Sequence, residues 1–387
     1  MGITTRSVCF GPGPQFKGGI ANYNLSLAKT FDKMPDTEVH IVSWTHQYPA
    51  IVPRDFKDPN RSNKLAGTDI KEEYITNYNR PGTWRAAAEY IISLDPQIVI
   101  LQWSIALQGL PLSAIAKRLR KKGIEVIVDC HLVVQKEASS LDIRFTRRCF
   151  KHVDTFITHS HKTSDELMAI MPDLKFEQYE DGTRAKDPNA RTIIKLYHPV
   201  YDMFEPDPNF DKPAFKQQLQ LKENVFLFFG FIRKYKGLHH CIEAFAKVAQ
   251  QRDDVSLLIV GESFWNTLDN KKFGTKVKQA LFGFAKKIFL QKADDERDYN
   301  PLSLIDELGI RDLTATVNEY VPNEDVHKYF QGSDCLVLYY LTATPSGVES
   351  MAYIFEMPTL ATKVGHFPET VKIGYNGYLA EPDNTDD

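Results

Sequence analysis

Several features that would assign a protein to a class are scarce in this chain of 387 residues. It has five cysteines, and because no two form a CxxC pair we expect reduced core residues and no metal site. No apolar run is long enough to span a bilayer, and residues 1–14 lack the apolar core of a signal peptide. The sequence therefore predicts a soluble, cytoplasmic protein with at most a peripheral membrane contact.

A strong excess of charge is also lacking. The formal net charge is −3, so nothing in the overall balance favours a nucleic-acid partner. Hydrophobic residues make up 43% and charged residues 25%, which is ordinary for a globular protein. At this length the chain can form two domains, each with its own core.

Short apolar runs alternate with helical patterns along most of the chain. Strands are predicted at residues 7–10, 39–43, 97–102, 125–130, 155–158 and 193–196, and in a second series at 225–230, 256–260, 314–318, 335–340 and 359–362. Helices are predicted at residues 20–31, 84–94, 112–122 and 324–330. This alternation predicts an α/β protein with parallel, doubly wound sheets that are covered on both faces.

A proline-rich, acidic stretch at residues 197–208 separates the two series of strands. Such a composition is typical of a domain connection. We therefore predict an N-terminal domain over residues 1–198, a C-terminal domain over 199–387, and a site in the cleft between them. Residues 173–191 are polar and are predicted to form a surface loop.

The second series is interrupted by a predicted insertion at residues 266–306, where lysines alternate with aromatic and aliphatic residues. A basic amphipathic helix of this kind can lie on an anionic membrane surface. It can equally pack on the domain with its lysines in water, and we prefer this second interpretation.

The most informative motif follows the first strand of the second series. Arg233 and Lys236 lie three positions apart, between the end of that strand and a helical pattern that begins near Lys236. Open α/β sheets bind ligands at such turns, where two cations and free helix amides suit a diphosphate. The alternative from these residues alone is a solvated surface loop.

Two glycines, Gly18 and Gly19, occupy the corresponding place after the first strand of the chain, where a helical pattern opens. They would let a ligand approach the backbone closely, or they form a flexible turn. The earlier Gly11 and Gly13 do not complete a dinucleotide-binding GxGxxG motif, since Phe16 stands at the third glycine position. This argues against a nicotinamide-dependent dehydrogenase.

Polar and aromatic residues also follow two other strands of the first series. His131 comes after residues 125–130, with Glu137 nearby, while Gln102 and Trp103 end the strand before it. These side chains would face the crevice at the carboxyl ends of the strands. A lone histidine is more often a satisfied core residue, and Trp103 either stacks on a sugar ring or caps the core.

Taken together, these motifs resemble the retaining family-4 glycosyltransferases of the GT-B fold. The resemblance rests on residues 229–238, 257–262, 320–338 and 346–369, on the glycine loop at 17–23, and on the strand ends at 102–103 and 130–131. It covers most of the chain apart from the predicted insertion. It implies two Rossmann-like domains with a cleft between them.

The resemblance implies a nucleotide-diphosphate sugar as donor and a glycan or lipid-linked glycan as acceptor, with no metal ion or other cofactor. Arg233 and Lys236 would bind the diphosphate and His131 the transferred sugar. The remaining residues implied on the donor side are Gly18, Gly19, Gly261, Glu262, Tyr320, Val321, Ser346, Gly347, Val348 and Glu349. Gln102, Trp103 and Glu137 would lie on the acceptor side.

The sequence departs from the family in two places. Ala343 and Met351 stand where these enzymes commonly carry two glutamates; Glu349 is a candidate substitute, or simply a glutamate favoured at a helix start. The resemblance also implies C-terminal helices beyond Asp387. We therefore predict a metal-independent, retaining hexosyltransferase, with a nucleotide-sugar epimerase, a phosphorolytic enzyme and a non-catalytic nucleotide-sugar-binding or partner-binding protein as alternatives.

Overall fold

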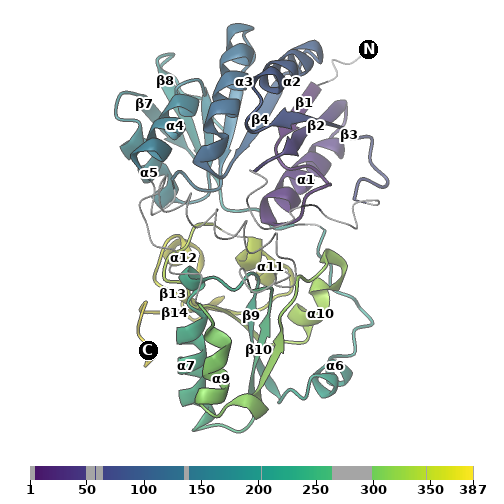
Figure 1. Cartoon of the computed structure of the whole chain (residues 1–387), viewed down its shortest axis with the longest axis vertical. Coiled ribbons are helices and arrows are strands. Elements are labelled where there is room, and N and C mark those ends of the chain that lie inside the picture. Colours follow the sequence, from purple (N-terminus) through teal and green to yellow (C-terminus); the bar gives the residue numbers. More distant parts are fainter. Residues whose placement is uncertain are drawn as a thin grey trace, which may run out of the picture. The chain divides into compact units, whose positions relative to one another are not determined.

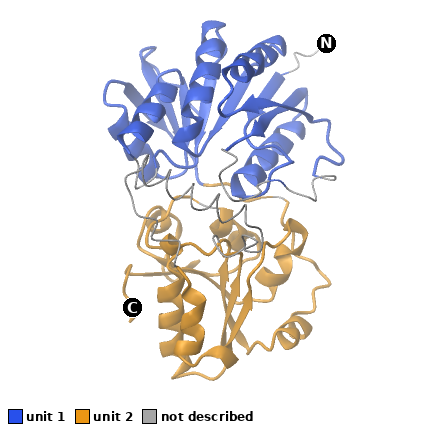
Figure 2. Ribbon diagram, viewed as in Figure 1, with its two compact units in different colours: residues 1–197, 277–291 blue, residues 198–276, 292–387 orange. Residues whose placement is uncertain are grey.

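The computed structural model describes residues 5–48, 57, 64–134, 139–201, 203–263, 299–345 and 347–386. These residues divide into two compact units, shown in different colours in Figure 2. Unit 1 contains the described residues up to Tyr197, and unit 2 contains those from His198 onward. Among the described helices, none is long and apolar enough to cross a membrane.

Unit 1 is built on an eight-stranded sheet in which all pairs are parallel. Its strands are β1 (Thr5–Phe10), β2 (Thr37–His46), β3 (Lys71–Asn77), β4 (Ile98–Trp103), β5 (Val126–Cys130), β6 (Thr155–Thr158), β7 (Lys175–Tyr179) and β8 (Ala190–Lys195). Their order across the sheet is β3-β2-β1-β4-β5-β6-β8-β7. The first six follow the order of a Rossmann sheet.

The helices of unit 1 connect these parallel strands (Figure 1). They are α1 (Gly19–Asp32), α2 (Pro81–Ser93), α3 (Gly109–Lys121), α4 (Ser140–Phe150) and α5 (His161–Ile170). Local sequence sets several of their starts: Pro81 begins α2, and Ser139 with Asp142 forms a capping box before α4. Helices α2, α3 and α4 pack side by side over a fully buried core that includes Trp103 and Phe150.

Unit 2 has a six-stranded parallel sheet of the order β11-β10-β9-β12-β13-β14, again a Rossmann order. Its strands are β9 (Asn224–Phe229), β10 (Val255–Val260), β11 (Thr314–Val317), β12 (Cys335–Leu338), β13 (Thr359–Thr362) and β14 (Gly377–Ala380). Its helices are α6 (Lys212–Gln218), α7 (Leu238–Ala249), α9 (Leu304–Glu307), α10 (Val326–Gln331), α11 (Gly347–Ile354) and α12 (Phe367–Thr370). Leu238, Ile242 and Phe245 of α7 form much of its core.

The predicted α/β class with two parallel sheets is confirmed. The prediction of a loop over residues 173–191 is wrong, because β7 lies within it at the edge of the first sheet. Strands β3 and β14 were also not predicted, and they too are edge strands. Most residues of β3, β7 and β14 are at least partly exposed, so these strands do not stand out as apolar runs, whereas the fourth edge strand, β11, is predicted correctly. Most of the predicted insertion lies outside the described residues.

Candidate functional site

Each sheet has a point near its centre at which the order of its strands reverses. In unit 1 this point lies between β1 and β4, and in unit 2 it lies between β9 and β12. The connections leave neighbouring strands in opposite directions there, which opens a crevice at the carboxyl ends of the strands. Most of the predicted site residues of the chain follow strands next to these two points.

Arg233 and Lys236 lie in the connection from β9 to α7. Arg233 precedes a short 3-10 turn, η3 (Lys234–Lys236), and its guanidinium carbon lies 5.8 Å from the centroid of the Tyr235 ring. Lys236 is only 6% exposed, and its ammonium nitrogen lies 5.4 Å from the centroid of the Tyr340 ring. The ammonium group also lies directly over Gly230, because a Cβ atom built on that glycine would be 2.8 Å from Nζ.

The electrostatic environment of Lys236 is unusual for a lysine. Among the residues that the structure describes, no carboxylate or other acceptor bonds its ammonium group. Burial, with a further contribution from the charge of Arg233, lowers the pKa of Lys236 to about 7. A buried cation without a protein counter-ion, next to a second cation, favours the binding of an anion.

The backbone closes tightly around this pair of cations. Gly261, after β10, has a φ of +148°, and a Cβ atom there would lie 2.0 Å from the carbonyl oxygen of Gly230. No side chain fits between the two strand ends, so glycine is required. The next residue, Glu262, accepts a backbone hydrogen bond from Ile232 at 3.0 Å, which joins the β10 end to the loop that carries Arg233.

The start of α11 lies at the same strand ends. A methyl carbon of Val348 is 3.7 Å from the Cβ position built on Gly230, and Gly347 packs against the ring of Tyr201. The predicted site residue Ser346 lies outside the described residues. Tyr320 and Val321 occur in the loop after β11, where both are partly exposed.

Glu349, the candidate substitute for the missing glutamates, is 3% exposed and bonded within unit 2. Its carboxylate accepts hydrogen bonds from His366 Nε2 at 2.6 Å, from the Tyr353 hydroxyl at 2.7 Å, and from the Thr370 hydroxyl. Burial alone would raise the pKa of Glu349, but the charge and bonds of these partners lower it. A carboxylate offers about four acceptor sites, and three of those on Glu349 are used here.

In unit 1, the predicted glycine pair opens α1. Gly18 is the residue before the helix and has a φ of +108°, while Gly19 is the first helical residue and is exposed. A Cβ atom on either glycine would meet nothing within 4 Å. The fold of unit 1 therefore leaves the first amides of α1 open to a ligand.

His131 follows β5 and is 8% exposed. Its Nε2 atom lies 2.6 Å from the Oε1 atom of Gln102, and because a carbonyl oxygen only accepts, Nε2 carries the proton. The Nδ1 atom is then an acceptor, and no described residue donates to it. Burial lowers the pKa of His131 to about 4, so the ring is neutral at neutral pH.

Trp103 is fully buried, in agreement with the core alternative for this residue. Its indole nitrogen donates to the carbonyl of Val133 at 3.1 Å, and its ring meets Phe150 edge-on at 4.8 Å. The predicted residue Glu137 lies outside the described residues.

Two further polar residues, Asp129 and His159, surround His131. They are bonded to each other at 2.8 Å, and the ring of Tyr23 meets that of His131 edge-on at 4.7 Å. Burial alone would raise the pKa of Asp129, but the charge and hydrogen bond of His159 lower it. The ligand atoms of Asp129, His131 and His159 all lie within 4.8 Å of one another, a set that could hold a metal ion. In the structure Nε2 of His159 is bonded to Asp129 and Nε2 of His131 to Gln102.

The sequence contains a signal for this cluster. Asp129 lies near the carboxyl end of β5 and His159 directly follows β6, its neighbour in the sheet. Polar side chains at the same end of adjacent strands meet at one edge, so His159 belonged with His131 from the start. Tyr340 lies within the predicted strand at residues 335–340 because it ends an apolar run, but β12 ends at Leu338 and leaves Tyr340 beyond it.

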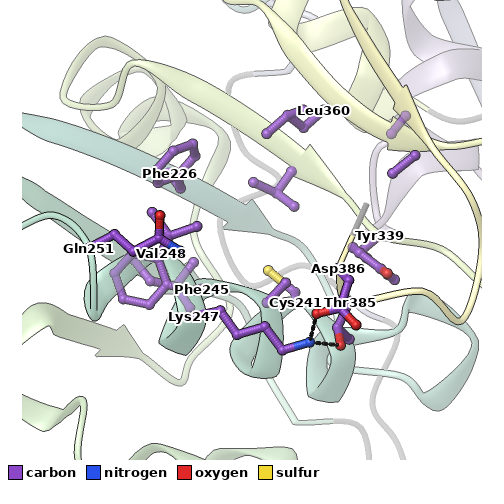
Figure 3. A pocket seen from close by; sticks show the side chains of 15 residues that line it. Phe226, Cys241, Phe245, Lys247, Val248, Gln251, Tyr339, Leu360, Thr385 and Asp386 are labelled. Atoms are coloured by element: carbon purple, nitrogen blue, oxygen red, sulfur yellow. Dashed lines mark hydrogen bonds and ion pairs between the residues drawn. The ribbon is translucent and has the colours of Figure 1, made fainter.

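A separate cavity of 340 Å³ in unit 2 is lined by residues of α7 and of the strands of the sheet (Figure 3). Phe226, Phe245 and Leu360 contribute to its apolar wall, and Lys247 bonds Thr385 and Asp386 at one end. It contains none of the predicted site residues. Its apolar lining does not suit a diphosphate.

Comparisons with known proteins bear on the family and the fold of the chain. The model of the family Glycosyl transferases group 1 matches residues 209–387. That segment carries the Arg233 and Lys236 turn and the start of α11. No curated protein matches the chain.

Among solved structures, the chain is similar to Anabaena HepE in complex with UDP, with a TM-score of 0.63 and 17% identity over 98% of this chain and 86% of that chain. The chain is also similar to a glycosyltransferase from Rickettsia africae, with a TM-score of 0.63 and 14% identity over 98% of this chain and 85% of that chain. Sucrose-phosphate synthase from Thermosynechococcus elongatus matches with a TM-score of 0.56 and 15% identity over 98% of this chain and 87% of that chain. At these identities the similarity concerns the fold, and the predicted GT-B fold of two Rossmann-like domains is confirmed.

Proposed function

We propose that this protein is a glycosyltransferase that transfers a hexose-type sugar from a nucleotide-diphosphate sugar to a hydroxyl group of a glycan or lipid-linked glycan. The transfer retains the configuration at the anomeric carbon and needs no metal ion. The observation that carries the proposal is the buried ammonium group of Lys236, which has Arg233 beside it and no carboxylate partner among the described residues.

The donor diphosphate is the ligand that suits this turn. It carries the negative charge that Lys236 lacks among the described residues, and it can accept from Arg233 and Lys236 together. Cations at the leaving diphosphate also stabilise the charge that develops there, which is the role a metal ion has in other transferases. HepE, which has the same fold, has been crystallised with UDP and with UDP-glucose.

Unit 1 would contribute the exposed amides at Gly18 and Gly19 and the neutral ring of His131. With Nε2 bonded to Gln102, the Nδ1 atom of His131 would accept a hydrogen bond from a hydroxyl group of the transferred sugar. A neutral histidine suits this role, because it adds no positive charge next to a sugar that becomes electron-poor during transfer.

The resemblance to retaining enzymes favours attack from the face that the diphosphate leaves. The acceptor oxygen forms a bond to the anomeric carbon as the bond from that carbon to the diphosphate breaks. The hydroxyl proton passes to the departing phosphate oxygen, so no protein nucleophile is required. Arg233 and Lys236 would stabilise the released nucleoside diphosphate.

Calorimetric titration with UDP, UDP-glucose and a panel of other nucleoside diphosphates tests the donor site. We expect selective binding by the wild type and at least a hundredfold loss in the variant Arg233→Ala/Lys236→Ala, because the diphosphate loses two charge-assisted partners. Lys247→Ala is the matched control: it removes a positive charge from the same unit, away from the strand ends, and should bind like the wild type.

Absence of binding by a folded wild type would refute the donor site. Binding without transfer to any acceptor, in a screen that includes lipid-linked glycans, would favour the non-catalytic alternative. Transfer that disappears with EDTA and returns with Mg²⁺ or Zn²⁺ would contradict the metal-independent mechanism.

A further inference from the structure

Tyr340 directs a polar group into the interior of unit 2 without a partner. The residue is 3% exposed, and its hydroxyl oxygen has no hydrogen-bond partner among the described residues. Burying an unpaired hydroxyl is unfavourable, and nearly all buried polar groups in proteins have a partner. An unpaired hydroxyl at a strand end next to a crevice therefore indicates a ligand.

The position of Tyr340 in the fold supports this inference. It follows β12, and Lys236 follows β9; these two strands flank the point where the order of the second sheet reverses. The ammonium group of Lys236 lies 5.4 Å from the centroid of the Tyr340 ring. An anion that contacts this ammonium group therefore comes close to the phenol.

The ring is held firmly in this place. It meets Phe367 edge-on at 5.5 Å and Tyr235 at 6.0 Å, and the Thr362 hydroxyl donates to the Tyr340 carbonyl at 2.5 Å. A side chain that is fixed before a ligand arrives loses little conformational entropy on binding. The hydroxyl is thus arranged in advance for a partner.

Among the residues that the structure describes, no free acceptor lies beside this hydroxyl. The charged acceptor near it is Glu349, whose carboxylate already accepts from His366, Tyr353 and Thr370. Burial, with contributions from Tyr235 and Glu349, raises the pKa of Tyr340 well above its ordinary value, so the hydroxyl keeps its proton. It is available as a donor and not as an anion.

We propose that Tyr340 is a further donor-site residue, whose hydroxyl donates a hydrogen bond to a phosphate oxygen of the nucleoside diphosphate that Lys236 binds. The inference rests on the proposed function and adds a third, uncharged contact to the two cations. Without ligand the hydroxyl is buried and has no partner among the described residues. In the complex it would donate a hydrogen bond to the phosphate.

The variant Tyr340→Phe tests this directly, because it removes the hydroxyl and leaves the ring. Titration calorimetry with UDP and with inorganic pyrophosphate, which lacks a base and a sugar, should show about a tenfold loss of affinity for both. The melting temperature of the ligand-free variant should equal or exceed that of the wild type, since an unpaired buried hydroxyl has been removed.

Thr359→Val is the matched control. The Thr359 hydroxyl is also buried without a partner among the described residues, but it lies at the amino end of β13, at the opposite edge of the sheet. The control should change the melting temperature only and bind both probes like the wild type.

Three results would overturn the inference. If Tyr340→Phe binds both probes normally while Arg233→Ala/Lys236→Ala does not, the donor site stands and the role of Tyr340 falls. If the ligand-free Tyr340→Phe protein melts several degrees lower, the hydroxyl has a partner within the protein. If the folded wild type binds neither probe, the proposed function and this inference fail together.

Discussion

At the residue scale, Lys236 is a buried lysine for which the described residues provide no counter-ion. Its pKa is lowered to about 7, mainly by burial and then by the charge of Arg233. In an unfolded chain a lysine has a pKa of about 10.4. From about pH 7 to pH 10 the unfolded chain therefore holds this proton more tightly than the folded protein, and stability rises with pH across that window.

The variant Lys236→Met should lack this dependence. We expect its melting temperature at pH 7 to exceed that of the wild type by at least about 2 °C, because the cost of burying a charge is gone. The difference should be largest at and below pH 7 and should shrink as the pH approaches 10. Thermal melts across this range, followed by circular dichroism, measure it.

Lys216→Met provides the contrast. Lys216 is also largely buried, with 15% of its side chain exposed, but it lies 2.8 Å from a carboxylate oxygen of Asp334. Its removal leaves that carboxylate with one cation fewer, so this variant should melt at a lower temperature than the wild type. If both variants lose stability, Lys236 has a counter-ion in solution and its site is not an anion site.

At the scale of elements, the proposed donor site depends on two strand ends that approach more closely than side chains permit. The ends of β9 and β10 meet where Gly261 faces the carbonyl of Gly230. This approach holds the turn that carries Arg233 in place through the backbone bond from Ile232 to Glu262. The geometry of the turn that carries Arg233 and Lys236 is thus set by neighbouring strands and not by the turn alone.

Gly261→Ala should disrupt this contact. A Cβ atom there would lie 2.0 Å from a carbonyl oxygen, at a φ of +148° that only glycine adopts readily. We expect unfolding free energy to fall by about 2 kcal/mol or more, with weaker binding of UDP. Denaturant melts and calorimetry measure the two effects.

Gly82→Ala is the control for this substitution. Gly82 lies in the first turn of α2, where its Cβ would meet nothing within 4 Å. Alanine should leave stability unchanged or raise it by about 0.5–1 kcal/mol. A Gly261→Ala protein as stable as this control would contradict the close approach of β9 and β10.

At the scale of the whole molecule, the chain contains two Rossmann-like units with separate cores. The proposed diphosphate contacts Arg233, Lys236 and Tyr340 belong to unit 2 alone. A ligand that binds a folded unit stabilises that unit by mass action. The two units should therefore respond differently to the donor.

Differential scanning calorimetry should resolve two unfolding transitions, and UDP should raise the midpoint temperature of the transition that belongs to unit 2. At a UDP concentration one hundred times the dissociation constant, the unfolding free energy rises by about 2.7 kcal/mol. Lys236→Ala identifies the transition, since it should abolish the shift. A shift that survives in Lys236→Ala would show that UDP binding does not depend on this lysine. An equal shift of both transitions would show that unit 1, where the amides at Gly18 and Gly19 lie, binds UDP as strongly as unit 2.

Much of the fold could be predicted from the sequence because its signals are local. The buried strands β1, β4, β5, β9 and β10 each contain a short, mostly apolar run, and helices such as α1 and α7 follow strands with helical spacing. Where a strand is exposed on one side, as in β3, β7 and β14, the local signal disappears. The cations of the phosphate turn were visible for the same local reason, since Arg233 and Lys236 stand between a strand and a helix.

Whether a polar group finds a partner was decided by the tertiary structure alone. Trp103 could have faced a ligand but is a core residue, because its ring packs against Phe150 and its indole nitrogen donates to the Val133 carbonyl. Glu349 is bonded by His366, 17 positions away in sequence, while Lys236 and Tyr340 remain without acceptors among the described residues. Burial and hydrogen bonding depend on residues distant in sequence, so the sequence determined which chemical groups are present, and only the packed fold determined which of them stay available to a ligand.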